Sequence, residues 1–422
     1  CDFIAKYGSS PDDRKAIVAH NKNGDDVEIS LDGKDTVLQI FKTMSESHLG
    51  ELSLFRIYSG TVKTGQDYYN SNRNTSERFG QMFLMNGKNR TQADQLFAGD
   101  IAGVVKLKDT HTGNTLCTGS HVTLPKLELP SPNIHSAIVS NSKGDEEKLA
   151  IGLATLHEED PTFVYRVDNE VKQTIISGQG ELHLTVTTER LKRRFGISIG
   201  LEKVKVPFRE TITTKGSAKY RHKKQSGGAG QFAEVWMKIE PKQNGEGIEF
   251  TQSLVGQNVD RVFVPSVEKG VKTACLEGIL AGCNVVDVKI DFYDGKMHPV
   301  DSKDIAFQTA GKHAFREAFL AAQPCLLEPI INIKVKVPED YMGDIMGDIS
   351  GKRGKIMGMD SEGGFQLINA QVPQAELHNY ATTVRSLTGG RGLHSESFSH
   401  YEKMPKELEQ KVIQERKTKE DE

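Results

Sequence analysis

The densest group of cationic residues lies at positions 219–224, where the sequence KYRHKK leads into the glycine-rich segment QSGGAGQ at 225–231. Lysine and arginine attract phosphates, and Tyr220 offers a ring on which a base could stack. Glycines let backbone N–H groups approach a phosphate without side-chain interference. These residues indicate a contact with nucleic acid. A flexible hairpin loop beside a solvated charged run also explains them, and on the residues alone that interpretation is favoured.

A second candidate loop has the sequence YDGKMHPVD at 293–301. Because Asp-Gly is a hairpin signal, we expect the Asp294-Gly295 pair to turn the chain and to place His298 near an exposed tip. A histidine there could titrate, bond to RNA or ligate a metal ion. An ordinary exposed histidine is the simpler interpretation from sequence alone.

A third loop, GKRGK at 351–355, carries Lys352 and Arg353 and follows a predicted helix with Asp344 and Asp348 four residues apart. Two carboxylates at this spacing could hold a divalent ion. They are favoured instead as a helix flank that balances the basic loop.

Sequence motifs for nucleotide binding and hydrolysis are missing. The GQG at 178–180 before Glu181 has the shape of an anion site at a helix start, but not the G-x-G-x-x-G spacing. No G-x-x-x-x-G-K-[ST], H-E-x-x-H or G-x-S-x-G occurs. We therefore expect no catalytic residue, metal ion or cofactor in this chain.

Composition bounds the remaining classes. The 54 Lys and Arg against 57 Asp and Glu leave a net charge of −3, which excludes a globally basic nucleic-acid coat but not a local basic patch. The five cysteines are scattered and form no C-x-x-C pair, so a disulfide framework and a thiolate zinc site are not expected. No apolar run approaches a membrane span. Because the chain begins with Cys1, we expect it to belong to a longer or processed protein.

Division by about 150 residues per domain predicts roughly three domains. Residues 1 to about 128 combine short β-prone runs (52–58, 67–70, 78–84, 101–107 and 121–124) with glycine turns, which favours a small barrel. The segment 35–47 is compatible with strand or loop.

Two later regions, about 133–206 and 329–401, each show the order β-α-β-β-α-β of ferredoxin-like units. One helix is expected to begin near Asp145 and to carry Leu149, Leu153 and Leu156, and a second is expected to end at Gly196. In the later region one helix is expected to open at Pro338 and another to span 374–387. Residues 206–326 mix strands and helices, and the alternating charges after 405 predict a solvated helix without another role. The fold class is therefore multidomain α+β.

Several longer motifs carry a resemblance to a known family. They are FRIYSG at 55–60, EEDP at 158–161, GQGELHL at 178–184, VPSVEKG at 264–270, YMGD at 341–344 and VRSLTGGRG at 384–392. With these motifs the chain resembles elongation factor G, from the end of its GTPase domain to its C-terminus, over essentially its whole length.

The resemblance implies a domain plan. Residues 1–14 would be the linker from a missing GTPase domain, followed by the β-barrel domain II at 15–128 and the ferredoxin-like domain III at 132–205. Residues 206–326 would be the tRNA-mimicking domain IV, an α+β fold like ribosomal protein S5. Residues 327–401 would be the ferredoxin-like domain V, and 402–422 a charged C-terminal helix. GTP and Mg²⁺ would belong to the missing domain, and the chain itself would not be an enzyme.

The resemblance also implies partners and sites. The protein would be a cytoplasmic monomer that binds the ribosome, tRNA and mRNA. No membrane is expected among its partners. The domain IV tip would contact RNA in the small-subunit decoding region through Gln225, Ser226, Gly227, Gly228, Ala229, Gly230, Gln231, Lys296, His298, Asp301 and Ser302. Basic contacts to RNA would come from Arg221, Lys223 and Lys224, and from Lys352 and Arg353 at the large-subunit factor-binding site.

Three features differ from the main translocase pattern. Ala229 stands where a basic residue is usual, Lys296-Met297 replaces a pair such as Ser-Tyr, and Pro299 follows the histidine. They favour a paralogue that acts in recycling, rescue or conditional translocation as the alternative function. A free-standing RNA-binding module without a nucleotide partner is the alternative from another class.

Overall fold

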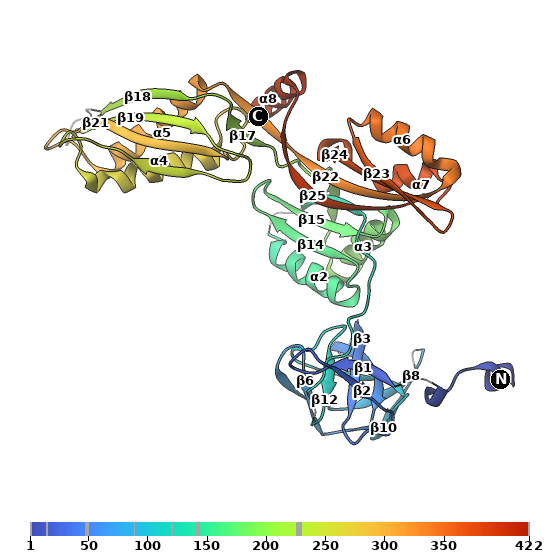
Figure 1. The fold of residues 1–422 in the computed structure, drawn as a ribbon. Helices are drawn as coiled ribbons and strands as arrows, with labels where there is room; N and C mark the ends of the chain where they lie inside the picture. The colour runs from blue at the N-terminus through green and yellow to red at the C-terminus, as the bar shows by residue number, and fades with distance from the viewer. Residues whose placement is uncertain are drawn as a thin grey trace. The chain divides into compact units, whose positions relative to one another are not determined.

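The computed structural model describes residues 2–13, 16–46, 50–87, 89–119, 121–140, 144–224 and 230–420. The chain divides into two compact units, and many of their helices and strands are labelled in Figure 1. Unit 1 contains residues 1–167 and 174–202, and unit 2 contains residues 168–173 and 203–422.

Unit 1 begins with two short helices and a β-rich region. These elements are α1 (Asp2–Tyr7), η1 (Pro11–Asp13), β1 (Ile17–His20), β2 (Asp26–Ile29), β3 (Val37–Glu46), β4 (Gly50–Ser59), β5 (Thr61–Lys63), β6 (Asp67–Asn70), β7 (Thr75–Arg78), β8 (Met82–Asn86), β9 (Asn89–Ala93), β10 (Gln95–Phe97), β11 (Ile101–Val105) and β12 (Thr115–Cys117). One antiparallel sheet runs in the order β7-β6-β12-β3-β4-β11-β8-β9. This path does not return from β9 to β7, so the sheet of the expected barrel is present but its closure is not shown.

For two segments of this region the structure can be compared directly with the sequence predictions. The segment 35–47, compatible with strand or loop, contains the long strand β3. The single strand predicted over 78–84 is wrong, because the chain breaks into β7 and β8 around Phe79. The Phe79 ring is fully buried, and its N–H and C=O bond to Gln66 and Gly65 across a turn. Phe79 is therefore part of a turn between β7 and β8 rather than of one continuous strand.

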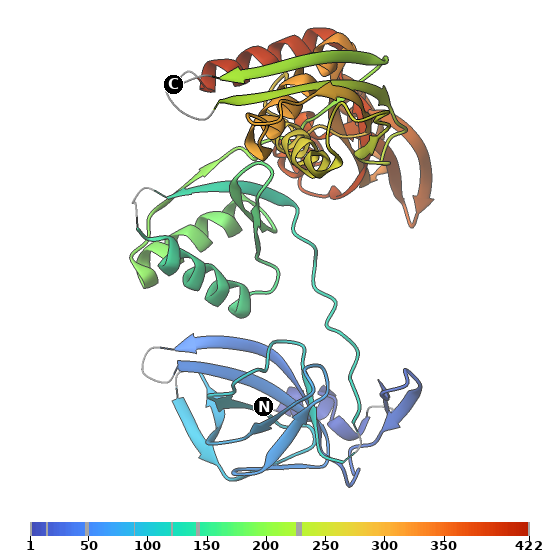
Figure 2. The same cartoon turned by 90° about the vertical axis from the view of Figure 1, so that its left-hand side faces the viewer.

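The rest of unit 1 is a four-stranded sheet covered by two helices. Its elements are β13 (Ile134–Ser140), α2 (Glu146–Glu159), β14 (Val164–Asp168), β15 (Gln173–Gly178), α3 (Glu181–Phe195) and β16 (Ile199–Glu202). The strand order β14-β15-β13-β16 is the ferredoxin-like order that the sequence predicts. Helices α2 and α3 lie side by side on one face of the sheet (Figure 2). Gly196 ends α3 at φ 72°, where its N–H bonds to two carbonyls of the last turn.

The acidic motif at the end of α2 is used inside unit 1. Glu159 accepts the backbone N–H of Ser45 in β3 at 2.9 Å and also pairs with Arg194 of α3 at 2.7 Å. Glu158 pairs with His111 Nδ1 at 2.8 Å. These bonds join the ferredoxin-like sheet to the β-rich region, which gives this conspicuous motif a structural role.

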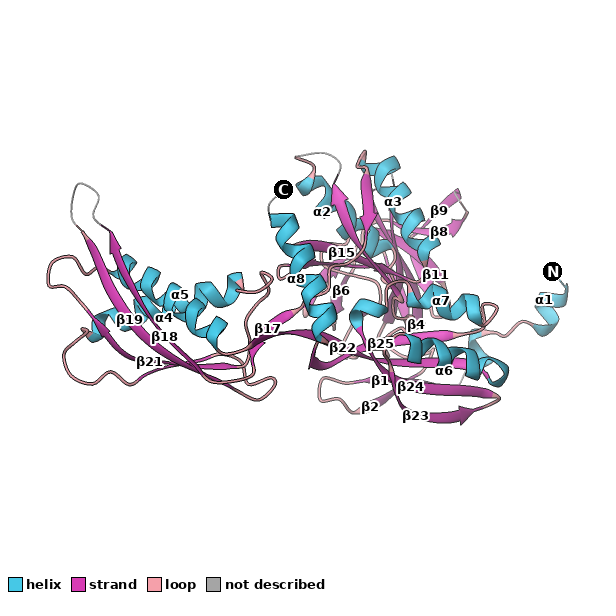
Figure 3. Cartoon of the chain, turned by 90° about the horizontal axis from the view of Figure 1, so that it is seen from above, coloured by secondary structure: helices cyan, strands magenta, loops and turns pink. Residues whose placement is uncertain are grey.

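Unit 2 contains a second sheet of antiparallel strands with one parallel edge. Its elements are β18 (Gly216–Lys224), β19 (Gln231–Pro241), β20 (Glu249–Gln252), η2 (Arg261–Phe263), α4 (Val264–Glu277), β21 (Val288–Lys296) and α5 (Asp304–Ala321). The strand order is β18-β19-β21-β20. Helices α4 and α5 lie along one face of this sheet (Figure 3). Between helices and sheet lies a core of residues such as Val235, Met237, Phe292, Phe307 and Phe315.

The last sheet of unit 2 is built around the long strand β22. Its elements are β17 (Arg209–Ile212), β22 (Pro324–Pro338), η3 (Glu339–Tyr341), α6 (Met342–Gly351), β23 (Lys355–Glu362), β24 (Phe365–Pro373), η4 (Gln374–Glu376), α7 (Tyr380–Leu387) and β25 (Leu393–Lys403). The order β23-β24-β22-β25 is again ferredoxin-like, and β17 pairs with the start of β22, residues 324–327. The single helix predicted over 374–387 is wrong, because Asn379 at φ 55° separates η4 from α7.

The sequence predicts that the C-terminal helix α8 (Lys406–Glu420) is a solvated helix without another role. In the structure one side of α8 packs against the rest of unit 2. Leu408, Val412 and Ile413 pack against a buried cluster that contains Leu326 and Met404. Arg416 donates to the carbonyls of Ala281 and Val206 at 3.4 and 3.3 Å. The spacing of these three apolar residues on one helix face indicates a packed side of the helix. The prediction of a solvated helix gives more weight to the alternating charges around them.

A buried carboxylate organises the loop after α4. Glu210 in β17 has no exposed surface, and its two oxygens accept backbone N–H groups of Ile279, Leu280, Ala281 and Cys283 at 2.7–3.0 Å. A carboxylate without solvent requires such donors, because an unpaired buried charge is strongly destabilising. Burial, with a smaller contribution from the Glu210 charge, raises the pKa of the Cys275 thiol to about 12.

Glu210→Gln should therefore lower the free energy of unfolding by about 3 kcal/mol, because an amide has one acceptor oxygen and turns an NH₂ group toward donors. The measurement is the urea midpoint, followed by the fluorescence of Trp236, the sole tryptophan. Glu240→Gln is the matched control, because Glu240 is exposed and pairs with Lys215. Equal midpoints for the two variants would contradict the role given to Glu210.

Candidate nucleic-acid interface

The two candidate loops of the α+β domain, 225–231 and 295–302, are here named the tip loops. The first connects β18 to β19, whose register pairs Lys224 with Gln231. Gln225, Ser226, Gly227, Gly228 and Ala229 lie outside the described residues, and Gly230 and Gln231 lie within them. The second tip loop follows β21 and leads into α5.

Backbone and side-chain bonds join the described parts of the tip loops. The Phe232 N–H donates to the Asp301 carbonyl at 3.0 Å. The Ser302 hydroxyl donates to the Phe232 carbonyl at 2.8 Å and accepts the His298 N–H at 2.9 Å. A Cβ on Gly230 would lie 3.0 Å from the Asp301 carboxylate, so a side chain there would crowd it. Segments about 70 residues apart therefore end at one place.

His298 is held by its own loop. Its Nδ1 accepts the backbone N–H groups of Val300 and Asp301 at 3.3 and 3.2 Å. Because an amide N–H can only donate, these bonds select the neutral ring that carries its proton on Nε2. The Asp301 carboxylate lies 3.4 Å from Nδ1. About half of the His298 side chain is exposed, which leaves Nε2 available as a donor.

The prediction that Asp294-Gly295 forms a hairpin turn is wrong. Strand β21 continues through Lys296, and its register against β19 shifts at Trp236. The shift places Gly295 so close to the Glu234 carbonyl that a Cβ would collide with it. The residue left out of the register is Tyr293, so the β-bulge lies directly before the Asp-Gly pair, and His298 follows the strand end at a distance of two residues.

Lys296 belongs with the strands rather than with His298. It faces Glu234, which forms an ion pair with Arg221 and accepts the Trp236 Nε1–H at 2.8 Å. Burial is the largest single influence on Glu234 and acts to raise its pKa. The bonds from Trp236 and Arg221 and the charges of Arg221 and Lys296 outweigh it, so the pKa of Glu234 lies below its usual value.

The remaining residues of the basic run are divided between the two faces of the sheet. Lys223 and Lys224 are exposed. A hydrogen bond of 3.0 Å joins His222 Nε2 to Gln231 Oε1. Tyr220, expected from sequence to offer a stacking surface, lies on the other face, where it packs against the core and stacks on His313 of α5. The expected stacking role of Tyr220 is therefore wrong, because strand alternation turns its ring toward the helices.

Lys352 and Arg353 occupy different environments although they are adjacent. The Arg353 guanidinium binds both oxygens of the buried Glu328 at 2.7 and 2.9 Å and also Glu376 at 3.1 Å. These bonds raise the pKa of Arg353 and tie β22 to η4. The Lys352 Nζ lies 3.6 Å from Asp348. The contact of either residue with RNA stays a prediction, and Arg353 has an internal function in any case.

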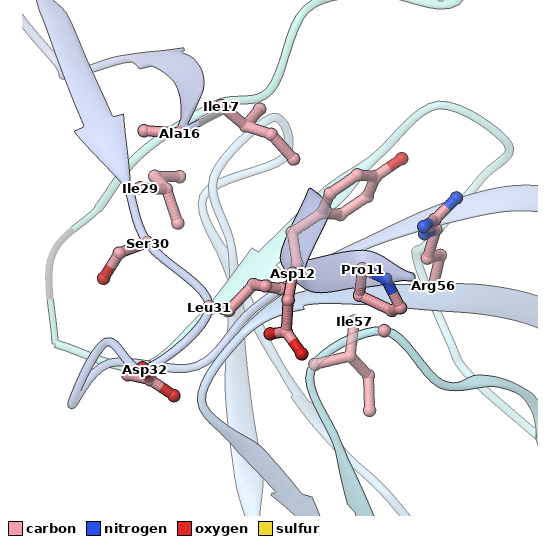
Figure 4. A pocket seen from close by; sticks show the side chains of 12 residues that line it. Pro11, Asp12, Ala16, Ile17, Ile29, Ser30, Leu31, Asp32, Arg56 and Ile57 are labelled. Atoms are coloured by element: carbon pink, nitrogen blue, oxygen red, sulfur yellow. The ribbon is translucent and has the colours of Figure 1, made fainter. Parts of the chain in front are cut away.

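A cavity of about 240 Å³ lies elsewhere, in the β-rich region of unit 1 (Figure 4). It is lined by apolar residues such as Ile17 and Ile57 and by Asp12, Asp32 and Arg56. None of the predicted site residues lines it. Within the described ranges, no group of three or more His, Cys, Asp or Glu side chains could hold a metal ion. Among the helices of those same ranges, none has the length and hydropathy to cross a bilayer.

Sequence reasoning missed Glu234 and Trp236, which the structure places beside Arg221. The available signal was alternation, because residues 219, 221 and 223 share one face of β18 and residues 234, 236 and 238 share one face of β19. The cross-strand register that brings Glu234 opposite Arg221 is a property of the folded sheet.

Glu234→Gln tests the carboxylate at the centre of this group. A carboxyl group whose pKa is lower when folded stabilises the protein above its unfolded pKa and loses that effect as pH falls through the folded pKa. We expect the variant to be less stable than the parent at pH 7, and the difference to shrink below pH 4.5, the ordinary value. Urea midpoints from circular dichroism check this, with Glu268→Gln on α4 as control. A difference that is constant down to pH 3 would contradict it.

Comparison with known proteins adds independent information. Four family models match, described as Elongation factor G domain 2 over residues 36–119, domain III over 129–203, domain IV over 204–323 and the C-terminus over 325–412. None of the four describes a GTPase domain.

A crystal structure of a protein from Thermus thermophilus is similar, with 34% identical residues and a TM-score of 0.80. The match covers 92% of this chain and 58% of that one, so this chain spans less than two thirds of that relative. Four models of one factor, matched in order from residue 36 to residue 412, agree with the motifs and with the sheets, and the chain belongs to the elongation factor G family.

Proposed function

We propose that this chain is the ribosome-binding region of a translational GTPase that moves tRNA and mRNA through the ribosome. In this proposal the tip loops enter the decoding region of the small subunit. The observation that carries the proposal is that Phe232, which directly follows the first tip loop, bonds to Asp301 and Ser302 of the second. Membership of the elongation factor G family supports a role in translation.

The chemistry of the tip suits an RNA contact that ignores base sequence. His298 Nε2, the Lys223 and Lys224 ammonium groups and the loop backbone can bind phosphate and ribose oxygens. A factor that acts on every codon needs such contacts. No acid or base step is required, because the tip would act by favouring one position of the tRNA over another.

GTP and Mg²⁺ would be bound by a GTPase domain of the whole protein. The 422 residues contain no sequence of P-loop form, so they do not fit either group. The contribution of this chain is therefore restricted to binding and positioning.

A second candidate function is that of a paralogue in ribosome recycling, rescue or conditional translocation. Ala229 removes one cation from the first tip loop, and Lys296 adds one that faces Glu234 on the sheet rather than His298. This redistribution of charge away from the loop end favours a modified tip function.

A toe-print of pre-translocation ribosomes with GTP and the GTPase-domain-containing parent tests the first function. We expect a shift of one codon, and we expect His298→Ala to slow it roughly 10–100-fold, through loss of a bond to a charged phosphate. His20→Ala is the matched control, because His20 is a half-exposed histidine paired with Asp26 in the β-rich region.

No shift despite ribosome binding would remove the translocase function and favour the paralogue. Absence of any ribosome binding would favour the free-standing RNA-binding module.

Lys352 and Arg353 are separated by a second pair of variants. Lys352→Gln should weaken ribosome binding in a pelleting assay without a change in urea midpoint, because its charge is only loosely paired. Arg353→Lys should lower the free energy of unfolding by about 1–2 kcal/mol, because an ammonium group cannot replace the two-pronged bond to Glu328. If Arg353→Lys keeps the parent midpoint and loses ribosome binding, the internal role assigned to Arg353 is wrong.

A further inference from the structure

The sheet of the α+β domain has one face that its helices do not cover. Helices α4 and α5 pack on the side that carries Val235, Met237 and Phe292 (Figure 3). Alternation along the strands turns the intervening residues to the opposite side. This surface is named the Trp236 face, and it comprises Lys219, Arg221, Lys223, Trp236, Lys238 and Tyr293.

Aromatic rings and ammonium groups are combined on the Trp236 face. The register sets Lys219 directly opposite Trp236. The rings of Trp236 and Tyr293 lie 6.2 Å apart at an interplanar angle of 74°. The Lys219 Nζ lies 5.6 Å from the Trp236 ring, and the Lys238 Nζ lies 4.2 Å from the Tyr293 ring. Both rings are only partly buried, so a flat ligand can reach them.

The orientation of the Trp236 indole is fixed by its hydrogen bond to Glu234. Glu234 is almost completely buried, accepts the Trp236 Nε1–H and forms an ion pair with Arg221. A side chain held in this way loses little freedom when a ligand stacks on it. Trp236 is therefore a prepared contact surface rather than a ring that drifts over the sheet.

The charges of this surface favour a polyanion. Among the described residues, Lys219, Lys223 and Lys238 form no ion pair, whereas Glu234 and Glu240 are paired with Arg221 and Lys215. Asp291 and Asp294, opposite Lys238 and Trp236 in the register, bond to the neutral donors Ser253 and Asn258 and keep their negative charge, but the three unpaired lysines outnumber them. Unpaired lysines that flank stacking rings are the combination by which proteins hold unpaired nucleic-acid strands.

We propose that the Trp236 face binds an unpaired stretch of RNA, with a base stacked on Trp236 and the neighbouring phosphates bound by Lys219, Lys223 and Lys238. This is a second RNA contact beside the tip loops, and it rests on the proposed function for the source of the RNA. Base stacking replaces the Lys219 ammonium group over the indole, which the flexible lysine stem allows.

Binding of a fluorescein-labelled 12-mer oligouridylate to the whole chain tests the proposal by fluorescence anisotropy. Quenching of Trp236 in the unmodified chain gives a second readout, because the chain has one tryptophan. We expect Trp236→Leu to weaken binding about tenfold and Trp236→Phe to weaken it less, because phenylalanine keeps a stacking ring. Lys238→Gln should reduce the slope of log affinity against log salt by about 0.7.

The matched control is Lys272→Gln on α4, an exposed lysine on the helical side that pairs with Glu268, and it should bind like the parent. Circular dichroism establishes that each variant is folded. Absence of quenching, or equal affinity of Trp236→Leu and the parent, overturns the proposal. So does polyglutamate that competes as well as the RNA, because the surface would then recognise acidic polypeptides.

Failure of this inference is distinguishable from failure of the proposed function. A chain that pellets with ribosomes but neither quenches nor binds the oligouridylate refutes only the Trp236 face. A chain that binds the oligouridylate through Trp236 but does not pellet with ribosomes supports the face and refutes the ribosomal function.

Discussion

The second unit depends on the burial of one negative charge. Glu210 leaves water completely and is stabilised by four backbone N–H groups of the loop after α4. Because β17 carries this carboxylate and also pairs with β22, the loop and the last sheet share one anchor. The C-terminal helix adds Arg416 at the carbonyl of Ala281, on the same loop. The strand that begins the α+β domain therefore also links it to the last sheet.

Strand β19 contributes both to the core of the α+β domain and to the candidate interface. The residues of β19 that face the helices form the core, and the alternate residues Glu234, Trp236 and Lys238 face outward. Its first residues also receive Asp301 and Ser302 of the second tip loop. Strand β19 thus connects the core of the domain with both surfaces proposed for RNA. A small rearrangement of β19 would therefore affect the tip loops and the Trp236 face together.

Local sequence signals served well where periodicity and capping act alone. The helix before Gly196 ends at that glycine, and the β-α-β-β-α-β order appears in both units as predicted. They failed where tertiary contacts compete with local preference. The strand predicted over 78–84 breaks at Phe79, whose backbone bonds to Gly65 and Gln66 across a turn, and Asp294-Gly295 stays within β21 because the partner strand β19 continues beside it. The apolar side of α8 was concealed by the charges around it.

The sequence by itself determined the element order, the family resemblance and the location of the basic run, because these depend on residue type and spacing along the chain. Only the tertiary structure decided which side chains meet. Alternation directs Tyr220 to the core and Trp236 outward, and register brings Glu234 beside Arg221. Arg353, equally cationic in sequence, is occupied by Glu328 and Glu376. Pairings between distant residues depend on strand register and burial, and neither quantity can be read from spacing alone.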